Sequence, residues 1–304
     1  MPASEFEFRA DDGHQLLGRR WLMEGRPRAI VQIAHGLAEH SARYARVADA
    51  LNAAGYGVYA NDHRGHGPGA PAADLGHFAD EEGWEKTVGD LWTFNRRIAK
   101  EQPGAPIVFL GHSLGSLLGQ QFVAEHSDAL AGAVLSGSNG KPPPIVTLGR
   151  LIARAECLRL GRRGKSGLIF QMWFGDFNKP FKPARTEFDW LSRDPKEVDA
   201  YVADPLCGFR FTNQLAIDVL DALPGLVAPE RLARIRKDLP IYIFSGERDP
   251  VGSNIQGLID ALKGAGFTKL AAHIYPGARH ETLNETNRDE VTRDLISWLD
   301  RWAG

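Results

Sequence analysis

Only two cysteines, Cys157 and Cys207, occur in the 304 residues of this sequence. They lie far apart and form no C-x-x-C pair, so neither a disulfide framework nor a cysteine-based zinc site is indicated, and we interpret both as buried thiols. An excess of basic residues is also missing, because the formal net charge is -2 and the pI is about 6.6. Nucleic-acid binding is therefore not expected, since it needs a positive field.

Long apolar runs are missing as well. The sequence has no stretch of about 18 apolar residues, the length that a membrane-spanning helix needs. Its first residues, MPASEFEFRADDGHQ, are charged where a signal peptide would be apolar. We therefore expect a cytoplasmic protein, and a hydrophobic content of 43% is enough for a large buried core.

The sequence does contain a series of short apolar runs of strand length. Residues 5–22 alternate apolar and polar side chains around Asp12-Gly13, which predicts a β-hairpin. The later runs are continuous, as in parallel strands that are covered on both faces, and helical periodicity fills most of the gaps between them. This order predicts a doubly wound α/β fold. The runs lie at 29–34, 58–60, 107–110, 130–135, 241–244 and 271–275.

The long interval between the runs at 130–135 and 241–244 shows helical patches without a strong strand. A structureless loop of that length is implausible in a compact domain. We predict that residues 139–228 form a helical cap inserted into an α/β core, which consists of residues 1–138 and 229–304.

The motif GHSLG, at 111–115, places a serine between two glycines directly after an apolar run. A strand that turns at once into a helix needs small neighbours, because the two backbones nearly touch there. Gly111 and Gly115 give that space, and Ser113 is expected to take a strained backbone conformation that exposes its hydroxyl. Since a helical pattern follows, we predict that Ser113 is a catalytic nucleophile.

A serine nucleophile needs a histidine base and an acid that orients the histidine. Where the nucleophile lies on such a turn, the chain order is serine, acid, histidine. Asp249 follows the run at 241–244, and His280 follows the run at 271–275, so this order is satisfied. Glu247 is a rival acid at this point. Three other histidines are more typical of structural positions: His273 in a strand, His126 at a helix end and His14 beside the hairpin turn.

Acyl transfer also requires two backbone N–H donors for the oxyanion. Leu114 follows the nucleophile and supplies one donor. The second donor should come from the loop after an earlier strand, and Leu37 lies in HGLAEH directly after the run at 29–34. We predict that the Leu37 and Leu114 amides form the oxyanion hole.

Several motifs together resemble one family. HGLAEHSARY at 35–44, NDHRGHG at 61–67 and GHSLG at 111–115 resemble the monoacylglycerol lipase and lysophospholipase branch of the α/β-hydrolases, often described as serine aminopeptidase S33 or Hydrolase 4. LSRD at 191–194 and DPL at 204–206 are similar to its cap. The resemblance covers nearly the whole chain. It implies a mostly parallel eight-stranded sheet flanked by helices, a cap between the sixth and seventh strands, Asp249 as the acid, and no cofactor.

The resemblance implies a small-molecule substrate, a carboxylic ester of a medium or long acyl chain, with monoacylglycerol or lysophospholipid favoured. An aminopeptidase is a second alternative, because the cap carboxylates Asp176, Glu187 and Asp189 could hold a substrate ammonium group. A non-catalytic binding protein on the same fold is the third. Chain-length preference and oligomeric state stay open.

One cap helix is expected to be amphipathic and basic. Such a helix either rests on an anionic membrane or packs on its own domain with a solvated basic face. Its apolar stripe consists of Ile145, Leu148, Leu151, Ile152 and Ala155, and its basic residues are Arg150, Arg154, Arg159, Arg162, Arg163 and Lys165, with only Glu156 opposing them. Two other patterns are set aside: GRRGKS at 161–166 lacks the spacing of a phosphate loop, and DHRGH at 62–66 fits a tight loop better than a metal site.

Overall fold

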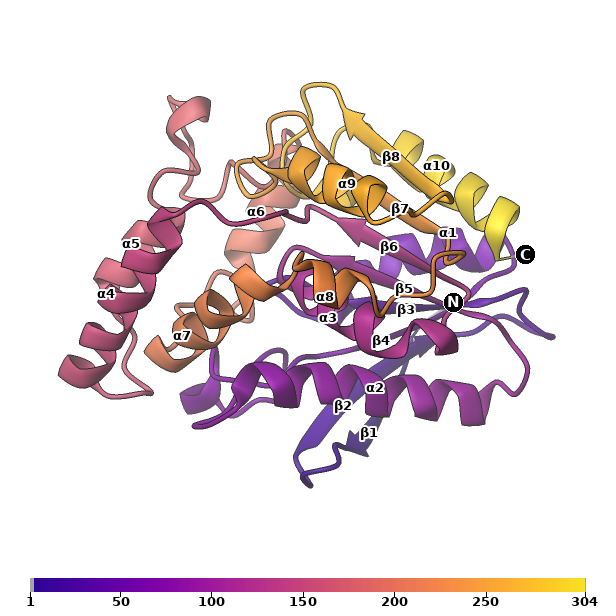
Figure 1. Ribbon diagram of the computed structural model, residues 1–304, viewed down its shortest axis with the longest axis horizontal. Helices are drawn as coiled ribbons and strands as arrows, with labels where there is room; N and C mark the ends of the chain where they lie inside the picture. Colours follow the sequence, from indigo (N-terminus) through magenta and orange to yellow (C-terminus); the bar gives the residue numbers. More distant parts are fainter. Residues whose placement is uncertain (1–2, 304) are drawn as a thin grey trace.

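Eight strands form one sheet in the computed structural model, which describes residues 3–303 (Figure 1). Their order is β1-β2-β4-β3-β5-β6-β7-β8, and all neighbours from β4 to β8 run parallel. This confirms the predicted mostly parallel α/β sheet. The strands are β1 (Ser4–Arg9), β2 (Gln15–Trp21), β3 (Ile30–Ala34), β4 (Gly57–Asn61), β5 (Ile107–His112), β6 (Gly132–Ser136), β7 (Ile241–Gly246) and β8 (Leu270–Tyr275).

The predicted hairpin forms one edge of the sheet. β1 and β2 pair antiparallel, from Ser4 opposite Arg20 to Arg9 opposite Gln15, and β2 pairs antiparallel with β4. Gly13 in the turn has a φ of 86°, a left-handed value that glycine adopts without steric penalty. The alternating pattern at 5–22 therefore marks the antiparallel part of the sheet.

Helices cover both faces of the sheet, which explains why the central strands are apolar throughout. On one face, α1 and α10 pack against side chains such as Val31, Val108 and Val134. On the other face, α2, α3 and α9 pack against side chains such as Ile30, Phe109 and Leu135. These helices are α1 (Ala45–Ala53), α2 (Gly83–Glu101), α3 (Leu114–His126), α9 (Ile255–Gly264) and α10 (Arg288–Trp302).

The segment between β6 and β7 contains helices and, within the described residues, no strand. Figure 1 shows α4, α5 and α7 of this segment to one side of the sheet, whereas α8 lies beside α3. No helix within residues 3–303 combines the length and the apolar character that crossing a lipid bilayer requires. The helices of this segment are α4 (Ile145–Leu160), α5 (Gly167–Phe174), α6 (Pro195–Ala203), α7 (Asn213–Ala222) and α8 (Pro229–Leu232).

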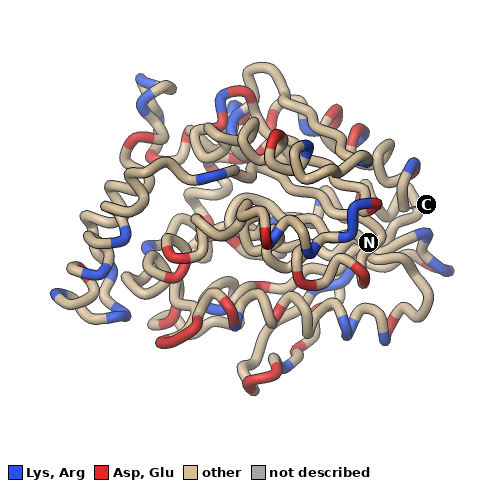
Figure 2. The backbone as a smooth tube through the Cα atoms, in the orientation of Figure 1, with Lys and Arg blue, Asp and Glu red and all other residues tan. Residues whose placement is uncertain are grey.

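α4 packs on its own domain, against α7, but not through the predicted apolar stripe. Ala153 and Glu156 are buried on α4, whereas Ile145, Leu148 and Leu151 are exposed. The basic residues do not form a free face either, because carboxylates bind several of them. Figure 2 shows where basic and acidic residues lie along the backbone. Arg150 and Arg154 contact Asp221, Arg159 contacts Glu156, and Arg163 contacts Asp74 and Asp80.

Candidate active site

Ser113 lies at the sharp turn between β5 and α3. Its φ of 52° and ψ of -120° are values that side-chain-bearing residues rarely adopt. A Cβ on Gly111 would lie 2.4 Å from the Gly115 carbonyl oxygen, and a Cβ on Gly115 would lie 2.1 Å from the Ala34 oxygen. Both distances are far below van der Waals contact, which confirms the steric demand inferred from the motif. The turn therefore carries backbone strain at the one residue that presents the hydroxyl.

Asp249 and His280 meet although they follow different strands. Asp249 Oδ1 lies 2.9 Å from His280 Nδ1, and both side chains are buried. The carboxylate is held in place by two further donors, Ser245 Oγ–H at 2.7 Å from Oδ2 and the Val251 N–H at 2.8 Å from Oδ1. This arrangement fixes the imidazole so that Nδ1 faces the acid and Nε2 is free to face another group.

Burial and the ion pair shift the pKa values of Asp249 and His280 in opposite directions. Burial alone would raise the pKa of Asp249, but the adjacent His280 and the hydrogen bonds that the carboxylate accepts hold that pKa below its ordinary value. Burial alone would lower the pKa of His280, but the charge of Asp249 and its hydrogen bond outweigh burial and raise it. The pair therefore favours an imidazolium beside a carboxylate, the charge state that forms when a histidine accepts a proton during catalysis.

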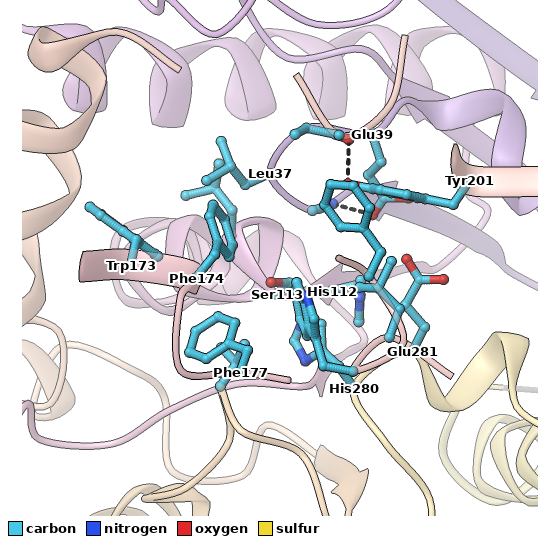
Figure 3. Close-up of a pocket in the computed structure, with 18 of the residues that line it drawn as sticks. Leu37, Glu39, His112, Ser113, Trp173, Phe174, Phe177, Tyr201, His280 and Glu281 are labelled. Atoms are coloured by element: carbon cyan, nitrogen blue, oxygen red, sulfur yellow. Dashed lines mark hydrogen bonds between the residues drawn. The ribbon is translucent and has the colours of Figure 1, made fainter. Parts of the chain in front are cut away.

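Ser113 and His280 line the same pocket, together with Leu37 and Leu114, so all the predicted site residues except Asp249 face one space (Figure 3). The cavity has a volume of about 70 Å³. Eight of its 22 lining residues are Phe, Trp or Tyr, and all eight lie in the segment between β6 and β7. The aromatic residues are Phe170, Trp173, Phe174, Phe177, Phe188, Trp190, Tyr201 and Phe209.

The two predicted oxyanion donors lie on structures suited to that role. Leu114 is the first residue of α3, and the first N–H groups of a helix have no intrahelical acceptor. Leu37 lies in the loop after β3, next to Ala38, whose φ of 56° is left-handed. The Gly36 N–H donates to Glu39 Oε1 at 2.6 Å and thereby holds this loop. Their assignment as the oxyanion hole stays a prediction.

A buried ion network behind the Leu37 loop was not predicted from the sequence. Arg43 donates to Glu39 Oε2 at 2.6 Å and to both oxygens of Glu281 at 2.7 Å, so it joins the Leu37 loop to the residue after His280. Burial alone would raise the pKa of Glu281, but Arg43 outweighs burial and lowers it to about 2. The i,i+4 spacing of Glu39 and Arg43 could have indicated the first contact. The second partner lies 238 residues away in the chain.

The loop that carries His280 is also bound to the helical segment between β6 and β7. The Glu281 N–H donates to the Leu191 carbonyl at 2.8 Å, and the His280 N–H donates to the Trp190 carbonyl at 3.4 Å. The Trp190 and His280 rings lie 5.2 Å apart. The LSRD motif therefore supports the histidine loop. Two more pairs join the same segments: Ser192 Oγ–H with the Asn284 carbonyl at 2.9 Å, and Arg193 with Glu285 at 2.8 Å.

The carboxylates that the sequence offered as alternatives do not line the pocket. Glu247 accepts a hydrogen bond from the Gly277 N–H on the protein surface rather than from a histidine. Of the carboxylates that could serve an aminopeptidase, Asp176 pairs with Lys179, and Asp189 accepts from Thr186 and the Arg185 N–H. Neither of these two, nor Glu187, is among the described residues that line the pocket. The pocket carboxylates are Glu39 and Glu281, and Arg43 binds both.

Residues 25–287 match the family model described as Hydrolase 4, serine aminopeptidase S33. The chain belongs to this family. A monoacylglycerol lipase of Mycolicibacterium smegmatis is 30% identical over 308 residues, which cover 97% of this chain and 96% of the relative. Monoglyceride lipase of Mus musculus is 27% identical over 300 residues, which cover 96% of this chain and 88% of the relative.

Solved structures show the same fold. A thermostable carboxyl esterase from Bacillus coagulans matches with a TM-score of 0.91 and 27% identity, covering 100% of both chains. A soluble variant of monoglyceride lipase from Saccharomyces cerevisiae matches with a TM-score of 0.79 and 20% identity, covering 100% of this chain and 97% of that one. The family resemblance and the α/β-hydrolase fold that the motifs predicted are thus confirmed.

Proposed function

We propose that this Hydrolase 4 protein is a serine ester hydrolase that cleaves carboxylic esters through an acyl-enzyme. One observation carries the proposal. Ser113, on its strained turn, opens into the same aromatic pocket as His280, whose Nδ1 lies 2.9 Å from the buried Asp249. Similarity to a monoacylglycerol lipase and a carboxyl esterase supports esters as the substrates.

In the proposed mechanism, Ser113 Oγ attacks the ester carbonyl carbon while His280 Nε2 accepts the hydroxyl proton. The N–H groups of Leu37 and Leu114 bind the oxygen that becomes negative. His280 then donates the proton to the leaving alcohol oxygen, and the acyl group stays on Ser113. A water molecule repeats these steps, which releases the carboxylic acid and returns the proton to Ser113.

The shape of the pocket suggests how acyl chains enter. A cavity of about 70 Å³ holds roughly five water molecules, less than a medium acyl chain occupies. Phe170, Trp173 and Phe174 of α5 form part of its wall. We propose that residues 139–228 act as the cap and that α5 moves outward when a medium or long acyl chain binds, with monoacylglycerol or lysophospholipid as the favoured class.

The test is the rate of hydrolysis of monoacylglycerols of increasing chain length, measured beside aminoacyl-anilides. We expect kcat/KM for the esters to rise to a maximum at medium or long chains, because the aromatic wall gains contact with each added methylene. The anilides should show at most trace turnover, since the pocket carboxylates are both bound by Arg43. Turnover of anilides alone would place the protein among the peptidases instead.

We also propose that the cap contacts lipid surfaces through α4 and α5. Ile145, Leu148, Leu151 and Leu158 are 63%, 50%, 59% and 92% exposed, and they recur at helical spacing along one face of α4. Leu168 and Met172 of α5 are exposed as well. These exposed apolar residues on α4 and α5 suit contact with the surface of a lipid aggregate, where acyl esters collect.

Changing Leu148, Leu151 and Leu158 together to serine is expected to weaken binding to lipid vesicles at least about tenfold, because each leucine loses its apolar transfer energy. Co-sedimentation with vesicles, with and without anionic lipid, measures the effect. The matched control changes Val202 and Ile274 to serine, since both are exposed apolar residues on other elements. Equal loss in the control, or unchanged sedimentation of the triple variant, would rule out docking through α4.

A cytoplasmic location is part of the proposal. Both cysteines are free thiols in the structure, Cys207 buried as predicted and Cys157 only half-buried. Free thiols persist in reducing compartments, which supports this location. Fractionation of the cells that produce the protein, followed by immunodetection, would test it.

A further inference from the structure

A second cluster of reactive side chains lies beside the Leu37 loop. Three potential metal-ligating atoms, one each from His40, Asp204 and Cys207, lie within 4.8 Å of one another, and this is the one such cluster with three or more members among residues 3–303. His40 Nε2 is 2.8 Å from Asp204 Oδ2. His40 and Cys207 are buried, whereas the Asp204 side chain keeps 31% of its exposure and offers a route from solvent.

One nitrogen of the His40 ring has no hydrogen-bond partner within residues 3–303. His40 is 7% exposed, and the nitrogen without a partner, Nδ1, is a buried atom. Buried polar atoms of this kind are uncommon and often mark a site for an ion or an ordered water. The other ring nitrogen, Nε2, faces Asp204, and histidine is the side chain that binds transition metals most often.

The negative charge for a cation comes from the cluster itself. Asp204 brings one carboxylate, and Cys207 brings a second negative charge as a thiolate. The neighbouring carboxylates of Glu39 and Glu281 are both bound by Arg43.

We propose that His40, Asp204 and Cys207 form a site for a thiophilic divalent cation, with Zn²⁺ as the ion of best fit. Imidazole, carboxylate and thiolate are all zinc ligands, and three protein ligands leave a fourth position for water. Binding releases the Cys207 thiol proton to solvent, and the Asp204 carboxylate shifts from the imidazole to the metal. The proton that His40 Nε2 donates to Asp204 is also lost to solvent while Nδ1 takes one up, so Nε2 binds the ion and the ring stays neutral. Movements of less than about 2 Å bring the three atoms to zinc–ligand distances of roughly 2.0–2.3 Å.

The site joins two parts of the active-site wall. His40 follows the Leu37 loop, whereas Asp204 and Cys207 follow α6 in the segment between β6 and β7. Hydrogen bonds already link these parts, since Ala38 O accepts from the Gly208 N–H at 2.9 Å and from Tyr201 Oη–H at 2.8 Å. A metal ion here would add a crosslink and make the oxyanion loop more rigid. It takes no part in the proposed ester cleavage.

Titration of the whole protein with Co²⁺ and Zn²⁺ tests the site. We expect one Co²⁺ per chain with a thiolate charge-transfer absorption, displacement of Co²⁺ by Zn²⁺, and a Zn²⁺-dependent rise in Tm of roughly 3 °C or more. Cys207→Ser should abolish the absorption, and Asp204→Asn should weaken binding at least about tenfold. Asp204→Asn changes a partly exposed side chain, so it still tests the site if Cys207→Ser fails to fold.

Cys157→Ser is the matched control, because Cys157 is the other free thiol and lies on α4. It should bind Co²⁺ like the unchanged protein. A signal that disappears in Cys157→Ser and persists in Cys207→Ser, or no stoichiometric binding at all, would overturn the proposal. Ser113→Ala should bind Co²⁺ normally, so the outcome is independent of whether the protein hydrolyses esters.

Discussion

Replacing Ser113 with alanine is expected to lower kcat for ester hydrolysis by roughly 10⁴- to 10⁶-fold, the loss seen when a triad serine is removed. The substitution removes the one hydroxyl on the strained turn that faces the pocket. Alanine keeps a Cβ at a φ of 52°, so the strain and the free energy of unfolding should change little. Activity on a monoacylglycerol measures the loss of kcat, and the thermal unfolding midpoint measures the change in stability.

Two further variants separate chemistry from folding. Ser113→Gly should be equally inactive but more stable by about 1 kcal/mol, because glycine adopts this backbone conformation without strain. Ser116→Ala is the matched serine control, since its hydroxyl donates to the Ser113 carbonyl at 2.6 Å rather than facing the substrate. It should keep activity within about tenfold, the cost of one hydrogen bond. Full activity in Ser113→Ala would refute the assignment of the nucleophile.

The sheet and the turn at Ser113 were predictable because local sequence determines them. Central strands such as β5 are buried on both faces, and this leaves a continuous apolar run that differs from the alternation in the edge hairpin. Gly111 and Gly115 are required because their Cβ positions would overlap backbone atoms. Each of these signals depends on residues within a few positions of one another, so the sequence displays them directly.

The contacts that complete the site were not predictable in the same way. A helical stripe shows that Ile145, Leu148 and Leu151 share one face of α4, but what covers that face depends on segments far away in the chain. Here α4 turns Ala153 and Glu156 inward instead. Partners such as Glu281 for Arg43 also come from distant loops that only the folded sheet brings together.

Replacing Asp249 with asparagine is expected to lower kcat/KM by roughly 10²- to 10⁴-fold. The carbonyl oxygen of the new amide could still accept the hydrogen bonds of His280 Nδ1 and the Val251 N–H, while Ser245 Oγ turns to accept from the amide NH₂. The ring orientation would then survive, and the loss would come from the missing charge beside the imidazolium. Glu247→Gln is the matched control, and it should change the rate less than about threefold, because Glu247 binds a surface N–H.

The pH profile distinguishes loss of charge from loss of geometry. His280 acts as a base only when it is neutral, and Asp249 raises its pKa above the ordinary value of 6.5. The rate of the unchanged protein should therefore fall as the pH drops through that raised pKa. The amide in Asp249→Asn carries no charge, so the pKa of His280 falls and the residual activity should extend to lower pH. If the acid limb of Asp249→Asn stays in place, or if Glu247→Gln shifts it instead, Asp249 is not the group that raises the pKa of His280.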